Sequence, residues 1–74
     1  MKYFWLVIQT RCNGKYAAHP CRVSESDNLM SVVNRYIGEP ITANICEGKK
    51  KAEMMAKAIN DQFKKDGVFL YDGE

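Results

Sequence analysis

Three consecutive lysines, Lys49, Lys50 and Lys51, lie in the stretch "ICEGKKKAEMMAKAIN" and occupy the first turn of a predicted helix. The start of a helix carries the positive end of its dipole, so like charge there is unfavourable by a few tenths of a kcal/mol per residue. Free N–H groups at a helix start bind phosphate or carboxylate, and lysines add point charges to such a site. The alternative is a solvated face whose charge Glu47 and Glu53 partly neutralise. The lysines are therefore candidate anion-binding residues, and we favour the solvated alternative.

A second candidate surface combines aromatic rings with arginines on one side of a predicted N-terminal hairpin, and its members are Tyr3, Trp5, Val7, Arg11, Tyr16 and Arg22. Aromatic side chains interleaved with cations are what stacking platforms for single-stranded nucleic acid require. An uncovered sheet face of this kind is also an apolar patch that marks a subunit interface. A third alternative is that the C-terminal segment of the chain covers this face. We favour a homodimer interface and keep nucleic-acid binding as the alternative.

The three cysteines and the single histidine are the residues that could carry nucleophilic or metal chemistry. Cys46 precedes the predicted helix by two residues, where the helix dipole and Lys49 favour a thiolate. His19 is the one imidazole that could act as its base, and nothing in the sequence places it near Cys46. His19 and Cys21 share a strand face, but the spacing of the cysteines matches no zinc pattern. With no glycine-rich phosphate loop or nucleophile elbow either, the sequence predicts a non-enzymatic protein without metal or cofactor.

Length and composition predict one small domain over residues 1–74, with 46% hydrophobic and 27% charged residues. A domain of this size buries about 60% of its unfolded surface, so its stability is marginal and self-association would help it. The net charge of +2 is too weak to indicate a polyanion partner by itself. The apolar run "YFWLVI" is too short to span a bilayer and lacks a cleavage site, and three cysteines make an odd count. We therefore expect a cytoplasmic protein with reduced thiols and no membrane association.

The elements that position these residues begin with a hairpin. Residues 3–12 are rich in aromatic and β-branched types, and Asn13-Gly14 is the preferred centre of a two-residue turn before the chain returns over residues 15–24. The resulting register places Cys12 and Cys21 roughly 20 Å apart along the ladder, too far for a disulfide. The same register directs one set of side chains to the core, opposite the aromatic and arginine set. This predicted core set is Phe4, Leu6, Ile8, Ala17, Cys21 and Val23.

Two helices and a third strand follow the hairpin. A first helix is predicted from an N-cap at Ser26 or Asp27 to a stop at Gly38. Pro40 precedes a half-buried strand, "ITANIC", with Ile41, Ala43 and Ile45 directed inward. A second helix begins near Gly48, carries an apolar stripe and stops near Asp66-Gly67, and "VFLY" is a short final strand. The stripe consists of Ala52, Met55, Ala56, Ile59 and Phe63. Pro20, which lacks an N–H, predicts a bulge or a sheet edge in the second strand.

The order ββαβα, with a further β at the end, predicts an α+β fold in two layers. Its sheet is mainly antiparallel, has three to four strands and carries both helices on one face. The segments "VSESDNLMSVV", "ITANICEGKKKAEMMAKAIN" and "FKKDGVFLY" resemble small proteins of prophages and integrative mobile elements in Gram-positive gut bacteria. That resemblance implies an accessory protein and assigns no activity or site residue. Together these observations predict a binding domain that forms a homodimer and engages a protein partner, with a nucleic-acid-binding module as the alternative.

Overall fold

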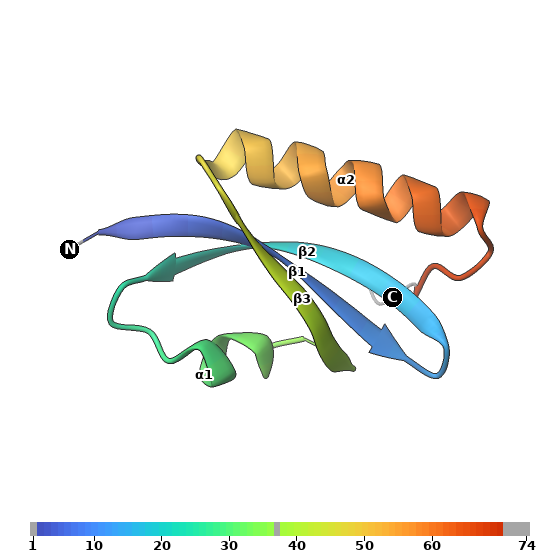
Figure 1. Ribbon diagram of the computed structural model, residues 1–74, viewed down its shortest axis with the longest axis horizontal. Coiled ribbons are helices and arrows are strands. Elements are labelled where there is room, and N and C mark those ends of the chain that lie inside the picture. Colours follow the sequence, from blue (N-terminus) through green and yellow to red (C-terminus); the bar gives the residue numbers. More distant parts are fainter. Residues whose placement is uncertain (1, 37, 71–74) are drawn as a thin grey trace.

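The computed structural model describes residues 2–36 and 38–70, which form a three-stranded antiparallel sheet and two helices (Figure 1). The sheet has the order β2-β1-β3, so β1 is the central strand. The predicted α+β class and the element order ββαβα are confirmed. The elements are β1 (Tyr3–Cys12), β2 (Lys15–Ser24), α1 (Leu29–Val33), β3 (Glu39–Cys46) and α2 (Lys49–Lys65).

The hairpin of β1 and β2 has the predicted register. Asn13 and Gly14 both have positive φ values, 54° and 77°, as a type I′ turn requires. Leu6 pairs with Cys21, and Ile8 pairs with His19. The pairing shows no register shift at Pro20, so of the two predicted alternatives the edge position of β2 is the one observed.

β3 pairs antiparallel with the edge of β1 that faces away from β2. Trp5 pairs with Cys46 and Ile8 with Ala43, and the register shifts between Gln9 and Thr10. This irregularity falls near Ile41, so the regular part of β3 runs through its second half. β3 is thus the second edge strand of the sheet.

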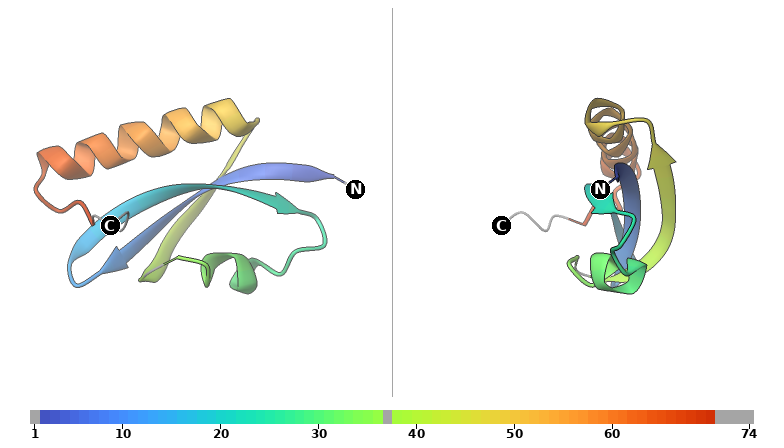
Figure 2. Two further views of the ribbon diagram at one scale, coloured as in Figure 1. Left: turned by 180° about the vertical axis from the view of Figure 1, so that it is seen from behind. Right: turned by 90° about the vertical axis from the view of Figure 1, so that its left-hand side faces the viewer.

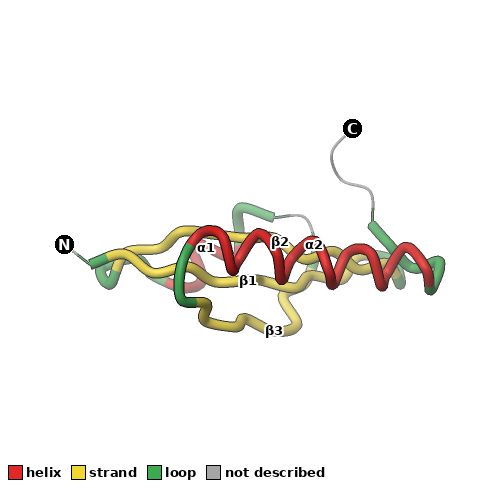
Figure 3. The backbone as a smooth tube through the Cα atoms, turned by 90° about the horizontal axis from the view of Figure 1, so that it is seen from above, coloured by secondary structure: helices red, strands yellow, loops and turns green. Residues whose placement is uncertain are grey.

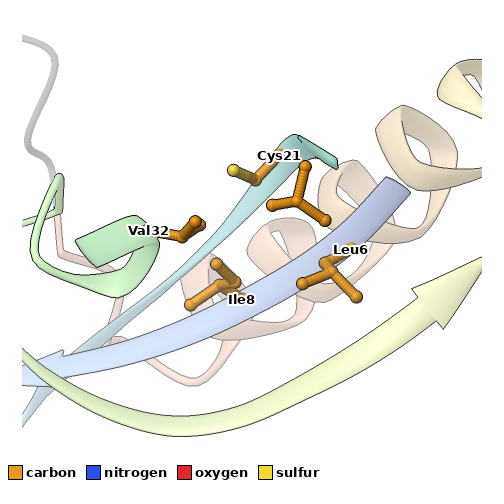
Figure 4. Close-up of a cluster of buried hydrophobic side chains, with 5 residues drawn as sticks. Leu6, Ile8, Cys21 and Val32 are labelled. Carbon is orange, nitrogen blue, oxygen red and sulfur yellow. The ribbon is translucent and has the colours of Figure 1, made fainter. Parts of the chain in front are cut away.

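The two helices pack on opposite faces of the sheet, which corrects the prediction that both share one face. Side chains alternate along β1, so Leu6 and Ile8 point to one face, called face A, and Val7 points to the other, face B. Val32 of α1 packs with Leu6, Ile8, Cys21 and Val23 on face A (Figure 4). The buried residues on face B are Val7 and Ala18 of the sheet with Ala52 and Ala56 of α2. In both views of Figure 2 the strands run between the two separated helices.

This arrangement buries three consecutive residues of β1. Leu6, Val7 and Ile8 are at most 4% exposed. A central strand that is covered on both faces reads as a continuous apolar run rather than an alternation. The run "FWLVI" is continuously apolar, so the sequence does indicate a strand that is covered on both faces. The predicted alternation between a core face and an uncovered face did not take this run into account.

α1 is shorter than predicted, mainly because it ends earlier, and its N-cap is a different residue from the two candidates. Asn28 is the N-cap, and its side chain accepts a hydrogen bond from the Met30 N–H at 2.9 Å. Asp27 instead accepts from the Ser24 N–H at 2.9 Å and so holds the preceding turn. The helix ends at Val33, well before Gly38. Gly38 is needed for another reason, since its φ is +99° and a Cβ there would lie 2.5 Å from the Arg11 carbonyl oxygen.

α2 matches its predicted start and end. It follows Gly48, and its C-cap is Asp66, followed by Gly67 with φ +72°. The small residues Ala52 and Ala56 are at most 3% exposed, which lets the helix approach the sheet closely. Seen from above, α2 lies over β1 and β2, with β3 to one side (Figure 3).

The predicted final strand is represented by a single parallel bridge between Phe69 and Tyr16. Tyr71, the last residue of "VFLY", lies outside the described residues. Of the predicted three to four strands, three are therefore complete in the described part of the chain, and residues 68–70 pair with the outer edge of β2 at one position.

Candidate functional site

Half of the predicted interface on face B, namely Trp5, Val7 and Tyr16, lies beneath α2, so the prediction of an uncovered face is wrong. Val7 is 0% exposed in the cluster with Ala52 and Ala56, and Trp5 packs against that cluster. The Tyr16 ring lies 5.3 Å from the Phe63 ring, centroid to centroid. The C-terminal segment covers these three residues, which was the third alternative considered for this face.

The other members of the predicted interface are exposed but satisfied locally. The Arg22 guanidinium lies 4.7 Å from the centroid of the Tyr3 ring. Arg11 donates to Glu39 at 3.3 Å, and this hydrogen bond raises the pKa of Arg11 above its ordinary value. The continuous aromatic and cationic platform expected from the sequence is therefore divided by α2 into a covered part and two small exposed pairs.

Lys49, Lys50 and Lys51 occupy the first turn of α2, as predicted, and all three are exposed. Lys51 Nζ lies 3.6 Å from a carboxylate oxygen of Glu47. Gly48, as the N-cap, supplies no side-chain acceptor to the helix start. The geometry thus provides part of the neutralisation that the solvated alternative requires, and anion binding by these lysines stays a prediction.

The sheet separates Cys46 from His19. Cys46 pairs with Trp5 and therefore lies on face B, whereas His19 pairs with Ile8 and lies on face A. A thiolate and its base must be within hydrogen-bond reach of each other. The Sγ of Cys46 instead lies 3.9 Å from the Sδ of Met55. The fold does not bring these two residues together as a nucleophile and its base.

His19 and Cys21 do share face A, as predicted, but they serve packing and hydrogen bonding there. His19 Nε2 lies 3.1 Å from Thr10 Oγ1, and its ring stacks on Tyr36 with centroids 4.3 Å apart. Burial, followed by a hydrogen bond to Cys21, raises the pKa of Tyr36 to about 12. Among residues 2–36 and 38–70, no three His, Cys, Asp or Glu side chains gather where a metal ion could bind.

The outer edge of β2 is closed along most of its length. The Tyr16 N–H donates to the Val68 carbonyl at 2.7 Å, and the Leu70 N–H donates to the Tyr16 carbonyl at 2.6 Å. Asn60 of α2 binds both backbone groups of Ala18, accepting from its N–H at 2.7 Å and donating to its carbonyl at 3.0 Å. Pro20, the next outward position, has no N–H to offer. A further strand therefore has little backbone to pair with on this side.

The outer edge of β3 is arranged differently. Because Tyr16 and Ala18 direct their backbone groups away from β1, their partners on β1 direct theirs toward β3. The same alternation across β3 directs the N–H and carbonyl groups of Ala43 and Ile45 to the free edge. β3 ends the sheet in the described part of the chain, so these groups face solvent.

β3 is also exposed on its faces, which corrects the prediction of a half-buried strand. Ile41 is 46% exposed and Ile45 is 75% exposed, and within β3 Cys46 alone is partly buried. The predicted alternation agrees with the pairing for Ala43 and Ile45, which lie opposite Ile8 and Leu6, whereas Ile41 falls at the register shift and has no partner on β1. The exposure arises because α1 and α2 both pack over β1 and β2, so face A is left uncovered along β3.

An apolar groove on face A adjoins this free edge. It has a volume of about 290 Å³ and lies between α1 and the β3 side of the sheet. Phe4, predicted to belong to the core, is 37% exposed and lines the groove with Ile45. Glu25 and Asp27 also line it and give it an acidic border. The groove and the free edge together form a surface suited to an extended, apolar chain segment.

The sequence itself contains a signal for this site. Residues 41–46, "ITANIC", carry no charge and include no internal proline. Natural edge strands are usually protected by charged side chains, proline, bulges or a covering element. An uncharged stretch at an edge therefore indicates either a buried position or an interface, and within the described part of the chain residues 41–45 are exposed.

Comparisons with known proteins give no family for this chain. No protein-family model matches it, and neither a curated protein nor a solved structure matches it. No helix within the described residues is long and apolar enough to cross a membrane.

Proposed function

We propose that this protein is a non-enzymatic protein-binding module that accepts an extended segment of a polypeptide at the free edge of β3. The main-chain groups of Ala43 and Ile45 supply the hydrogen bonds, as in other cases of strand addition to a sheet edge. Alternate side chains of the bound segment enter the groove beside Phe4 and Ile45. The observation that carries the proposal is the exposure of residues 41–45, which lie in the uncharged part of β3, at an edge of the sheet.

This proposal agrees with the leading interpretation of the sequence, a binding domain with a protein partner. It differs in the binding surface, which is the edge of β3 and not face B. An accessory role on a mobile element, as the resemblance in the sequence suggests, is compatible with such a module and is part of the proposal. Nucleic-acid binding loses support, because Trp5 and Tyr16 are packed beneath α2. The part of this alternative that the fold leaves accessible is the exposed start of α2, with Lys49, Lys50 and Lys51.

A displayed library of random twelve-residue peptides tests the proposal. The protein is attached sparsely to the support, so that each molecule presents its own β3 edge. We expect selection to enrich peptides that alternate apolar and polar residues, because side chains on one face of the added strand must fill the groove. Two variants then probe the site, Ala43→Pro, which removes an outward N–H, and Ile45→Lys, which places a charge beside the groove.

Both variants should reduce binding of the selected peptides at least tenfold while retaining the circular dichroism spectrum of the wild type. Proline is tolerated on an edge strand when its nitrogen faces solvent, and Ile45 is exposed. Ala58→Lys is the matched control, since it adds the same charge at an exposed position of α2. Selection without enrichment, or peptides that bind wild type and both variants equally, would refute the proposal.

A further inference from the structure

We infer that a second copy of this chain occupies the free edge of β3, forming a two-fold dimer with one continuous six-stranded sheet. The strand order across this dimer is β2-β1-β3-β3-β1-β2. The inference rests on the proposed function, because it uses the same edge, and it names the segment that fills the edge when no other partner is bound.

The first argument is the register that two-fold pairing of β3 allows. Residues with outward backbone groups must face each other, so Ala43 lies opposite either Ala43 or Ile45 of the second copy. The pairing of Ala43 with Ala43 would place Glu39 opposite Glu47, and like charges directly opposite are destabilising. This register would also pair Ile41 with Ile45 of the second copy, although Ile41 lies at the irregular part of β3.

The alternative register avoids both problems. Asn44 lies opposite Asn44 of the second copy on the two-fold axis, and Ala43 lies opposite Ile45 on either side of it. The interface then uses only the regular half of β3. A large and a small apolar residue meet twice on face A, which is the self-complementary pattern that a two-fold interface requires.

The second argument concerns charge and burial. In a two-fold pairing only the residue on the axis faces its own copy, and here that residue is the uncharged Asn44; residues 41–46 carry no charge that the pairing would have to bury. Pairing would cover Ile45, which is 75% exposed in the single chain. Pairing would also place the uncovered parts of face A along β3, one from each copy, side by side as one apolar surface. For a domain of this size, burial between copies adds to a core that is small by itself.

Cross-linking at the two-fold axis tests the register. Cysteine is introduced at position 44 or 42 in a background in which Cys12 and Cys46 are replaced by serine. In the inferred register the two copies of residue 44 face each other at a distance that a disulfide can span, whereas the two copies of residue 42 are separated along the ladder. We expect Asn44→Cys to form a covalent dimer on mild oxidation at least tenfold faster than Thr42→Cys.

Sedimentation across the micromolar range tests the dimer itself, with the peptide experiment above as the independent measurement. The wild type should dimerise, and Ala43→Pro and Ile45→Lys should each weaken the association at least tenfold, with Ala58→Lys as the control. A wild-type monomer, a dimer that survives both variants, or equal cross-linking at positions 44 and 42 would overturn the inference. If the wild type is monomeric but selected peptides still require Ala43 and Ile45, self-pairing is wrong and the proposed function stands.

Discussion

The two edges of the sheet differ in how their backbone groups are satisfied. At β2 the chain provides partners for Tyr16 and Ala18, from residues 68–70 and from Asn60, and Pro20 removes a donor. At β3 the outward groups of Ala43 and Ile45 face solvent, and the side chains around them are uncharged. Since sheet edges are templates for pairing with another chain, this difference is the reason for proposing the β3 edge as the interaction surface.

The largest effect is expected from opening the β2 edge. Asn60→Ala removes both hydrogen bonds to Ala18, which is 4% exposed, and so leaves a buried N–H and a buried carbonyl without these partners. We expect the free energy of unfolding to fall by about 2 to 3 kcal/mol. Asn44→Ala on exposed β3 is the matched control and should change it by less than about 0.5 kcal/mol. Chemical denaturation at low protein concentration measures both, and equal effects would contradict the contrast between the edges.

A smaller difference is expected between apolar residues on the two edge strands. Val23 of β2 is 4% exposed and packs with Val32, whereas Ile45 of β3 is 75% exposed, although both lie on face A. Val23→Ala should lower the free energy of unfolding by about 1 to 2 kcal/mol, and Ile45→Ala by less than about 0.5 kcal/mol in the monomer. A comparable loss for Ile45→Ala at low concentration would show that β3 is buried within the single chain.

The pH dependence of stability reports on the β2 side of face A, where Tyr36 stacks on His19. Burial raises the pKa of Tyr36 from 10 in the unfolded chain to about 12 in the fold, so the folded state favours the neutral phenol. The resulting stabilisation is complete below pH 10 and is lost as the pH rises from 10 toward 12. Thermal melts of Tyr36→Phe should show a shallower decline over this window. Tyr3→Phe, at an exposed position, should melt like the wild type.

The smallest effects concern the start of α2, the helix that covers the β2 side. Lys49→Gln and Lys50→Gln should each raise the free energy of unfolding by a few tenths of a kcal/mol in low salt, because like charge leaves the helix start. Lys51→Gln should gain less, since Lys51 pairs with Glu47. Thermal melts with and without phosphate provide the measurement. Variants that are less stable than the wild type only in phosphate would show instead that an anion binds there.

Gly48→Asp adds a negative charge at the same helix start, where the lysine substitutions remove positive charge. An aspartate N-cap accepts a hydrogen bond from the first turn and complements the dipole, so we expect stabilisation of about 0.5 to 1 kcal/mol. The backbone φ of 178° is accessible to any residue, and no described heavy atom lies within 4 Å of the added Cβ. A destabilised variant in thermal melts would contradict this interpretation of the helix start.

Local chemistry determined several elements from the sequence alone. Asn13-Gly14 specified the turn and, through it, the whole register of the hairpin, because a two-residue turn fixes which residues pair. The apolar stripe of α2 and Gly67 specified that helix and its end. These features were predictable because the interactions that define them join residues close together in the chain.

The faces and edges of the sheet were decided by tertiary structure. An alternating pattern shows that Ile41, Ala43 and Ile45 share a face, but burial depends on whether a helix lies over them. Packing placed α1 and α2 on opposite faces over the same two strands, so Val7 became core and Ile45 became surface. The outward groups of β2 found their partners in Asn60 and residues 68–70, forty or more positions away, whereas those of β3 did not find them within the described chain. Such long-range pairings are not encoded in any local pattern, and they determined which edge of the sheet keeps unpaired backbone groups within the described residues.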